Sequence, residues 1–214
     1  MPLDDKKVLE AIKKVKQNSK KRKFVQSIEL AVNMKDVDLK KPENRLNTEL
    51  TLPNEIGRDP KICVIATGDL AVKAKNAGVY VIDKDELGEV ARNKKNVKKL
   101  AQDYDFFVAR ADVMPQVGKT LGSVLGPRGK MPKPVPPNAD IKTILDQYKK
   151  NARIRMRENP VIHLRVGNEE MDEKKIVDNV QSVINFLEGK FEKGSRNIKS
   201  VYLKTTMGPA IKVE

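Results

Sequence analysis

The chain has little of several residue types on which common scaffolds and sites depend. Its 214 residues include one cysteine, Cys63, one histidine, His163, and no tryptophan. One cysteine cannot form an internal disulfide, and one histidine is poor material for a zinc site or a His-based triad. No run of about eighteen apolar residues occurs, and the first residues, MPLDDKKVLE, lack the apolar core of a signal peptide. These absences argue against secreted disulfide scaffolds, zinc proteins, His-dependent hydrolases and membrane proteins.

The charge of the chain is strongly of one sign. Lys and Arg number 43 against 29 Asp and Glu, which gives a formal net charge of +14. An excess of this sign attracts polyanions, and nucleic acid is the leading candidate. Residues 62–150 contain 16 basic and 10 acidic residues (+6), and the remainder contains 27 and 19 (+8). Neither part is a dedicated basic tail, so both could touch a polyanion.

The two ends of the chain carry patterns of the same kind. Apolar residues recur at helical spacing over residues 5–17 and 172–187, while strand-like alternation marks residues 24–32, 45–52, 151–166 and 199–206. These patterns predict an α+β terminal domain with helices on one face of an antiparallel sheet. The other face would carry Ser27, Glu29, Arg45, Asn47, Thr51, His163, Arg165, Ser200, Tyr202, Lys204 and Thr206.

The middle of the chain has a different pattern. The runs KICVIATG, GVYVID and DFFVAR are typical of strands buried on both faces, and helical stretches lie near residues 70–76 and 84–101. A further helix is expected from Asn138 to Lys150. Strands alternating with helices predict a Rossmann-like, three-layer α/β domain with a parallel sheet. The sequence therefore predicts two domains. Residues 1–61 and 151–214 form the terminal domain, and residues 62–150 form a domain inserted in it. The chain passes twice between the two domains, which allows a hinge.

An open sheet face suits RNA, because it offers hydroxyls and cations without an obstructing layer. Any one-sided sheet also exposes a polar face without a ligand, and the positive charge favours the RNA interpretation. The basic run of residues 20–23 ends in Phe24, which would add an aromatic for base stacking. A solvated helix end is the alternative for the cations. For Phe24, core burial is favoured, because Phe24 shares the parity of Ile28 and Leu30.

Two Gly- and Pro-containing segments are sharper features. In TTMGPAIKV, Gly208-Pro209 predicts a tight turn after a strand, where Thr205, Thr206 and Met207 could approach a sugar-phosphate backbone. In LGPRGKMPKP (residues 125–134), a stiff basic loop would direct Arg128, Lys130 and Lys133 toward a phosphate. The alternative for the second segment is a long surface loop with ordinary solvated charges.

An enzyme or small-molecule binder is a competing class, because a Rossmann-like domain can hold a nucleotide. The first apolar strand runs into Ala66-Thr67-Gly68-Asp69 rather than G-x-G-x-x-G. A Walker A match ending at Gly129-Lys130 fails at Val124 and Met131. Cys63, inside an apolar strand, is expected to be buried and inert. No catalytic residue, cofactor or metal is therefore predicted. A generic nucleic-acid chaperone is a third reading, and it predicts no preference among RNAs.

Four motifs together resemble one family along essentially the whole chain. They are SVYLKTTMGP (200–209), LGPRGKMPKP (125–134), DVMPQVGKTLG (112–122) and KFVQSIEL (23–30). The sequence is similar to the family of large-subunit ribosomal protein one (L-one) in its archaeal form. That resemblance implies a non-enzymatic cytoplasmic protein of the large ribosomal subunit, monomeric when free. It would bind large-subunit rRNA at the mobile stalk, assist release of exit-site tRNA and repress its own mRNA by binding the mRNA leader.

The resemblance also implies which residues contact RNA. Family contacts lie mainly in the terminal domain, and the inserted domain contributes less to affinity. Carried over by motif, they fall in three segments of this chain: Lys23, Phe24, Ser27 and Glu29 in the first, His163 and Arg165 in the second, and Ser200, Thr206, Met207 and Gly208 in the last.

Overall fold

The chain is a mixed α/β protein built as two compact units. The computed structural model describes residues 4–57, 59–137 and 140–213. Residues 1–58 and 149–214 form one unit, the terminal unit, and residues 59–148 form the other, the inserted unit. Each unit has its own buried hydrophobic residues. The terminal unit therefore combines the first and the last segments of the chain.

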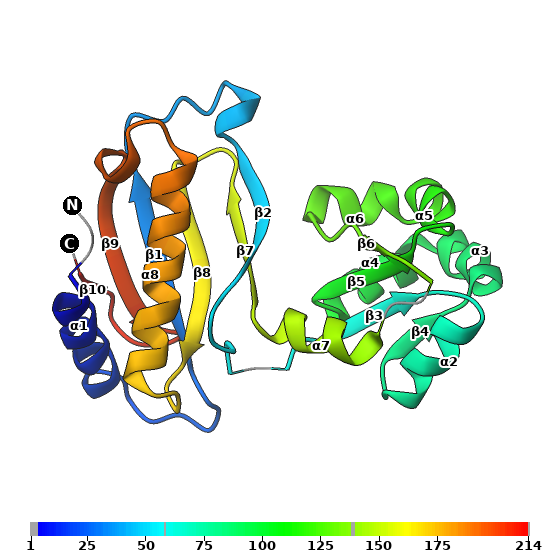
Figure 1. The fold of residues 1–214 in the computed structure, drawn as a ribbon, viewed down its shortest axis with the longest axis horizontal. Helices are drawn as coiled ribbons and strands as arrows, with labels where there is room; N and C mark the ends of the chain where they lie inside the picture. The colour runs from blue at the N-terminus through cyan, green and yellow to red at the C-terminus, as the bar shows by residue number, and fades with distance from the viewer. Residues whose placement is uncertain (1–3, 58, 138–139, 214) are drawn as a thin grey trace. The chain divides into compact units, whose positions relative to one another are not determined.

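The main sheet of the terminal unit is antiparallel and has the order β10-β9-β1-β8. β1 comes from the start of the chain and lies between two strands from its end (Figure 1). In the central register Leu30 lies opposite Leu164 on one side and Leu203 on the other. The strands are β1 (Ser27–Met34), β8 (Val161–Asn168), β9 (Ile198–Thr205) and β10 (Ile211–Lys212).

A second, two-stranded antiparallel sheet is formed by β2 (Leu46–Thr51) and β7 (Asn151–Met156). The expectation that Arg45, Asn47 and Thr51 share one sheet face with β1 is therefore wrong. Alternation identifies the buried side of a strand, but it does not identify the partner of that strand. The apolar side of this small sheet still packs into the core of the terminal unit.

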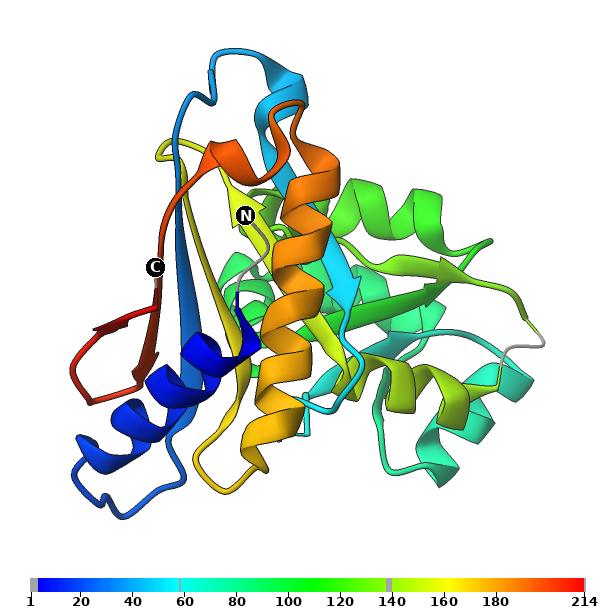
Figure 2. The ribbon, with the colours of Figure 1, turned by 60° about the vertical axis from the view of Figure 1, so that its left-hand side comes forward.

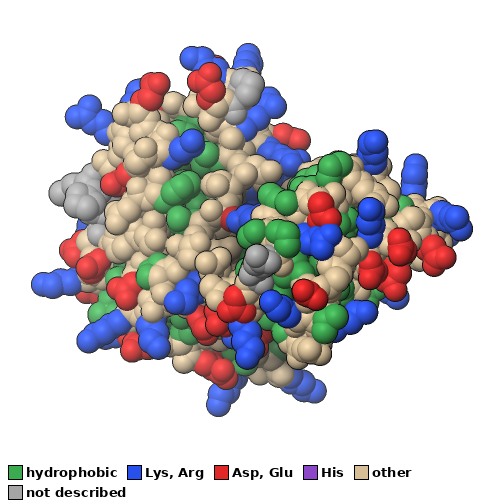
Figure 3. All heavy atoms as spheres, turned by 45° about the vertical axis from the view of Figure 1, so that its right-hand side comes forward, with side chains coloured by type: hydrophobic (Ala, Val, Ile, Leu, Met, Phe, Trp, Pro, Cys, Tyr) green, Lys and Arg blue, Asp and Glu red, His purple; other side chains and the backbone are tan. Residues whose placement is uncertain are grey.

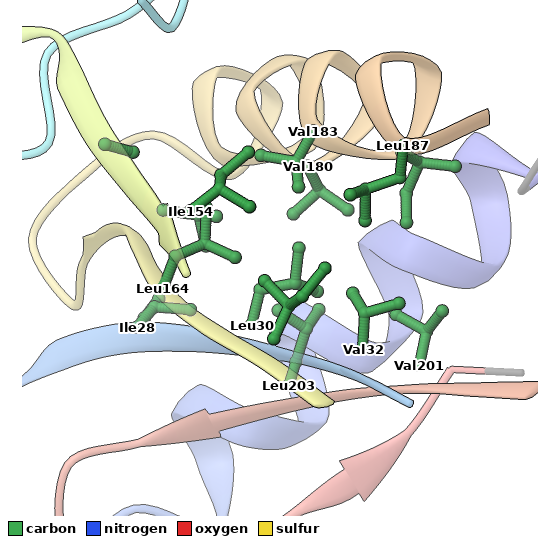
Figure 4. Close-up of a cluster of buried hydrophobic side chains, with 14 of the residues drawn as sticks. Ile28, Leu30, Val32, Ile154, Leu164, Val180, Val183, Leu187, Val201 and Leu203 are labelled. Atoms are coloured by element: carbon green, nitrogen blue, oxygen red, sulfur yellow. The ribbon is translucent and has the colours of Figure 1, made fainter. Parts of the chain in front are cut away.

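Two long helices cover one face of the main sheet, α1 (Asp5–Gln17) and α8 (Glu173–Lys190). Each begins at an aspartate, Asp4 or Asp172, whose side chain accepts a hydrogen bond from a first-turn N–H. Their apolar stripes are buried as the helical spacing predicts. Figure 4 shows side chains of α8 pointing at those of the strands. Two short 3-10 helices, η1 (Pro42–Asn44) and η2 (Gly194–Asn197), complete the unit.

Asn179 is a fully buried amide on the inner side of α8. Its Nδ2 donates to the Val166 carbonyl at 2.8 Å, and its Oδ1 accepts from the Asn54 N–H at 3.0 Å. One side chain thus joins α8 to β8, an edge strand of the main sheet, and to the segment that follows β2. Both backbone groups are polar, so each needs a partner once it is removed from water.

The inserted unit has a four-stranded parallel sheet with buried residues on both faces. The strand order is β4-β3-β5-β6, so β4 and β5 both pair with β3. One face packs against α3 to α6 and the other against α2 and α7, giving three layers. The strands are β3 (Ile62–Ile65), β4 (Tyr80–Ile82), β5 (Phe106–Arg110) and β6 (Lys133–Val135).

The helices of the inserted unit differ from expectation in three places. The single helix predicted over 84–101 is broken at Asn93, whose side chain caps the second helix. The segment 125–134, expected to be a stiff loop, begins with the last turn of a short helix that ends at Arg128. The predicted start at Asn138 lies outside the described residues, and Asp140 accepts hydrogen bonds at the observed start. The helices are α2 (Asp69–Asn76), α3 (Lys84–Arg92), α4 (Lys94–Asp103), α5 (Met114–Thr120), α6 (Gly122–Arg128) and α7 (Ile141–Lys149).

Cys63 lies in β3 and has no exposed surface. Burial raises the pKa of its thiol to about 12, because the apolar surroundings disfavour the thiolate. The thiol therefore stays protonated at neutral pH, as an inert cysteine requires. Among the helices in the described part of the chain, none is long and apolar enough to span a bilayer.

Asn179→Ala is expected to lower the free energy of unfolding by about 1–3 kcal/mol, because it leaves the Val166 carbonyl and the Asn54 N–H without their hydrogen-bond partner. Asn185→Ala is the matched control, since Asn185 is exposed on the same helix, and it should change stability by less than about 0.5 kcal/mol. Urea unfolding followed by circular dichroism measures both. Equal losses of stability in the two variants would contradict the conclusion that Asn179 stabilises the fold by joining α8 to β8 and to the segment after β2.

Candidate nucleic-acid interface

The face of the main sheet turned away from α1 and α8 carries mostly polar side chains. Ile28, Leu30 and Val32 point into the core, so the residues between them point outward. β8 and β9 continue the same alternation at the paired positions. We call this outward set the open face: Glu29, Ala31 and Asn33 of β1, Val161, His163 and Arg165 of β8, and Ser200, Tyr202 and Lys204 of β9.

The strand register arranges the open face in rows. Glu29 lies between Arg165 and Lys204, so one carboxylate is flanked by two cations. In the next row Ala31 lies between His163, which is exposed, and Tyr202. Because Ala31 is small, it leaves the longer His163 and Tyr202 side chains on its two flanks uncovered. The face thus offers cations, an imidazole and a phenol to a partner.

The turn after β9 is tied to the first residue of β1. Thr206 accepts a hydrogen bond from the Ser27 N–H through its hydroxyl and donates its own N–H to the Ser27 carbonyl, both at 3.1 Å. At Gly208 a Cβ would lie 2.3 Å from Thr205 Oγ1, which is closer than carbon and oxygen can approach. Glycine is therefore required for the turn to lie this close to the buried Thr205 hydroxyl.

Gln26 connects this turn with two other segments at the same end of the sheet. Its Nε2 donates to Ser19 Oγ at 2.9 Å and to the Lys20 carbonyl at 3.0 Å, and its Oε1 accepts from the Met207 N–H at 3.2 Å. Its backbone N–H donates to Glu169 Oε1 at 2.9 Å. We call this set the Gln26 junction. In both Figure 1 and Figure 2 the loops before β1, after β8 and after β9 lie at one end of the terminal unit.

Large apolar side chains are exposed beside the junction. Phe24 is 52% exposed and Met207 is 60% exposed, and all four residues of the basic run 20–23 are exposed. The expectation that Phe24 is buried in the core is wrong. β1 begins only at Ser27, and the chain before it is held through Gln26, so the alternation does not extend back to Phe24. Aromatic, thioether and cationic groups therefore share one exposed surface.

The structure divides the predicted contact residues into three places. Ser27 and Ser200 are buried, at 6% and 8% exposure, and Ser200 Oγ accepts from Asn33 Nδ2 at 2.8 Å. Ser200 lies roughly 20 Å along β9 from Thr206, at about 3.3 Å per residue. The end group is Lys23, Phe24, Ser27, Thr206, Met207 and Gly208; the central group is Glu29, His163 and Arg165; Ser200 stands at the far end.

Sequence reasoning missed the residues that hold the end group together. Ser19, Gln26 and Glu169 are not among the residues predicted to contact RNA. The signal was present, because a polar residue occupied an apolar parity position between Phe24 and Ile28. A buried amide at such a position needs partners, so it marks a place where other segments converge.

The sequence predicts that the basic residues of LGPRGKMPKP lie on a loop directed at a phosphate, and the structure contradicts this. Residues 125–128 belong to α6, and Lys133 begins β6. Lys130 Nζ donates to the carbonyls of Ala101 and Tyr104, at 2.9 and 2.6 Å, and Arg128 donates to the carbonyl of Lys98 at 3.1 Å. Lys130 thus satisfies carbonyls at the C-terminal end of α4, where a helix favours positive charge, and Arg128 bonds a carbonyl in the middle of the same helix.

The carboxyl ends of β3 and β5 are where an open parallel sheet commonly binds a ligand. There Arg110 donates to the Thr67 carbonyl at 3.1 Å and forms an ion pair with Asp112. Hydrogen bonds from Arg110 lower the pKa of Asp112. The charged groups at this edge thus bind one another. Within residues 4–57, 59–137 and 140–213, no three acidic, cysteine or histidine residues are grouped to hold a metal.

Positive charge is not gathered in one patch on the face drawn in Figure 3. Lys and Arg side chains project over much of that view with Asp and Glu among them. Such a distribution attracts a polyanion without orienting it.

Comparison with known proteins gives consistent matches over most of the chain. The model of a family described as "Ribosomal protein L1p/L10e family" matches residues 12–209. Three similar proteins are each named "Large ribosomal subunit protein uL1". The protein of Methanothermococcus thermolithotrophicus is 48% identical, over 99% of this chain and 100% of its own length. That of Methanothermobacter thermautotrophicus is 50% identical, over 96% and 98%. That of Pyrococcus abyssi is 49% identical, over 100% and 98%.

The exposure of Phe24 predicts that its side chain contributes little to folding. Phe24→Ala should change the free energy of unfolding by less than about 1 kcal/mol. Ile28→Ala, at a fully buried position of the same segment, should cost about 2–5 kcal/mol because it leaves a cavity. Urea denaturation compares the two. If Phe24→Ala lowered the free energy of unfolding as much as Ile28→Ala, the Phe24 side chain would have to be buried in the core.

Proposed function

The chain belongs to the ribosomal protein L1p/L10e family, and from this we propose that it is a component of the large ribosomal subunit that binds large-subunit rRNA through its terminal unit. Its binding domain is residues 1–61 with 151–214, and residues 62–150 contribute less. Names of the similar proteins support the ribosomal role, since each is a large-subunit protein. The site itself supports RNA as the ligand.

One observation carries the assignment of the site. Phe24 and Met207 are exposed beside the basic run 20–23, on segments held together by Thr206 and Gln26. Exposed apolar side chains suit bases and sugar faces, and exposed cations suit phosphates. Because the backbone of the turn is fixed, both kinds of contact are presented in one geometry. This is what recognition of a preformed RNA shape requires.

The open face extends the contact away from the junction. Glu29 and the flanking Arg165 and Lys204 place acceptors and donors along the sheet, where ribose hydroxyls and phosphates can pair with them. His163 is exposed in the next row. Ser27 and Ser200 are mostly buried, so their contribution is to hold neighbouring groups as well as to contact RNA.

Further roles rest on the family resemblance. The protein is non-enzymatic and monomeric when free, and in the ribosome it assists release of tRNA from the exit site at the mobile stalk. Surplus protein represses translation of its own mRNA, whose leader carries a weaker copy of the rRNA site. Regulation is then competition: the rRNA site fills first, and only unassembled protein reaches the mRNA.

A competition titration tests the function. A fragment of large-subunit rRNA carrying the stalk site should compete best, the leader of the protein's own mRNA next and random RNA least, at several salt concentrations. Affinity for each should fall as salt rises, because phosphate contacts release counterions. Equal affinity for all three RNAs would instead identify a generic nucleic-acid chaperone.

Met207→Ala should weaken binding of the rRNA fragment by about 1–3 kcal/mol, in the range of single protein–nucleic acid contacts. Met131→Ala is the matched control, because Met131 is an exposed methionine of the inserted unit, and its affinity should equal that of the unmodified chain. Filter binding measures both, with circular dichroism to check folding. An unchanged affinity of the Met207 variant removes that residue from the interface.

A further inference from the structure

Gln26 makes more hydrogen bonds than closing the sheet requires. Its backbone N–H and carbonyl already pair with Glu169, at 2.9 and 3.0 Å, and so continue the contact between the segments beside β1 and β8. The side-chain amide is therefore not needed to extend the sheet. It is fully buried, and it reaches two segments that carry exposed groups of the interface.

The two ends of the amide serve different segments. Nε2 holds the start of the basic run through Ser19 Oγ and the Lys20 carbonyl, and it also lies 3.4 Å from Glu169 Oε2 as a donor. Oε1 holds the turn after β9 through the Met207 N–H. A carboxamide donates and accepts at once, and its atoms are coplanar. The planar amide therefore joins the basic run to the turn, beside a second link in which the Ser19 and Thr205 hydroxyls lie 2.9 Å apart.

The exposed side chains next to these anchors belong to backbone that the amide helps to hold. Met207 is unbranched and 60% exposed, so its direction depends mainly on where its backbone is held. Lys20 opens a run of four exposed cations, and its carbonyl is bonded to Gln26. The anchor is thus a backbone group in both segments, while the side chains remain available to a ligand.

We propose that Gln26 is a positioning residue for RNA binding: it touches no RNA, and it fixes the basic run 20–23 and the Met207 turn in the arrangement that RNA meets. This inference rests on the function proposed for the terminal unit. Without the amide, the Ser19 and Thr205 hydroxyls still link the two segments, but the Lys20 carbonyl and the Met207 N–H lose their common partner, so the chain on both sides samples more conformations. RNA must then order them on binding, and affinity falls.

Asn179 supplies the comparison that separates positioning from simple stabilisation. It is also a fully buried amide, with one accepted and one donated hydrogen bond to backbone groups. Its partners, Asn54 and Val166, belong neither to the basic run nor to the turn. Loss of Asn179 should therefore lower stability without changing the RNA site of the folded protein.

The experiment uses the full chain and the rRNA fragment. Gln26→Leu removes the amide at similar volume and without a change of charge. We expect its affinity, measured where circular dichroism shows full folding, to fall about tenfold. Asn179→Ala should bind like the unmodified chain under the same conditions. In combination with Met207→Ala, the two losses should be less than additive, because Gln26 acts partly through Met207.

Methionine methyl NMR gives a readout that needs no RNA. With all seven methionines labelled, the Met207 resonance is assigned by its loss in Met207→Ala. We expect Gln26→Leu to shift or sharpen this resonance, and Asn179→Ala to leave it in place. Gln26→Asn, a shorter and uncharged amide that cannot reach both segments, serves as the second variant if Gln26→Leu does not fold, and it should act in the same direction.

The outcomes separate the two claims. A folded Gln26 variant that binds rRNA as tightly as the unmodified chain, or that leaves the Met207 resonance unchanged, overturns the positioning role while RNA binding stands. Fully additive losses with Met207→Ala also overturn it. If the unmodified chain shows no preference for the rRNA fragment, the proposed function fails, and the methyl spectrum alone then decides whether Gln26 orients the turn.

Discussion

The pairing of β1 with β8 and β9 is the constraint on which the rest of the terminal unit depends. β1 comes from the start of the chain, yet both of its neighbours come from the end. The face that it shares with them packs against α1 and α8, so the core is complete only when the last strands are in place. The junction has the same requirement, because Gln26 and Met207 lie 181 positions apart. Fold and interface are therefore completed by the same long-range contacts.

Two buried amides show how polar groups add specificity to this core. Asn179 satisfies backbone groups where α8 crosses β8, and Gln26 does so where the loops meet at the end of the sheet. A buried amide is costly without partners, so each excludes arrangements in which its segments separate. The difference lies in what surrounds them. The segments bound by Gln26 carry the exposed basic run 20–23 and the exposed Met207, so there the buried amide also fixes where cationic and apolar side chains meet solvent.

Local sequence patterns predicted many of the helices and strands, but they did not predict which strands and residues pair when these lie far apart in the sequence. The stripes of α1 and α8 and the runs of β3 and β5 were visible in sequence, because helical and buried-strand periodicity depends on neighbours along the chain. The separate pairing of β2 with β7 was not visible in the sequence, since alternation of apolar and polar residues does not show which strand is the partner. Phe24 was wrongly predicted to be buried for a related reason, because the alternation of β1 was assumed to continue before Ser27, its first residue. The turn at Gly208 was predictable, but its anchor at Gln26 depends on residues far away in sequence.

The positive charge has a different meaning once its contacts are known. Lys130 and Arg128 bind carbonyls of α4 and of the residue that follows it, and Lys16 donates to the Met171 carbonyl at 2.7 Å. Cations held in this way still contribute to the long-range field, but their hydrogen bonds already have partners within the fold. The formal +14 therefore describes attraction better than recognition. On the function proposed above, recognition would depend on the small group whose backbone the Gln26 junction fixes, and attraction by the whole surface would bring RNA to it.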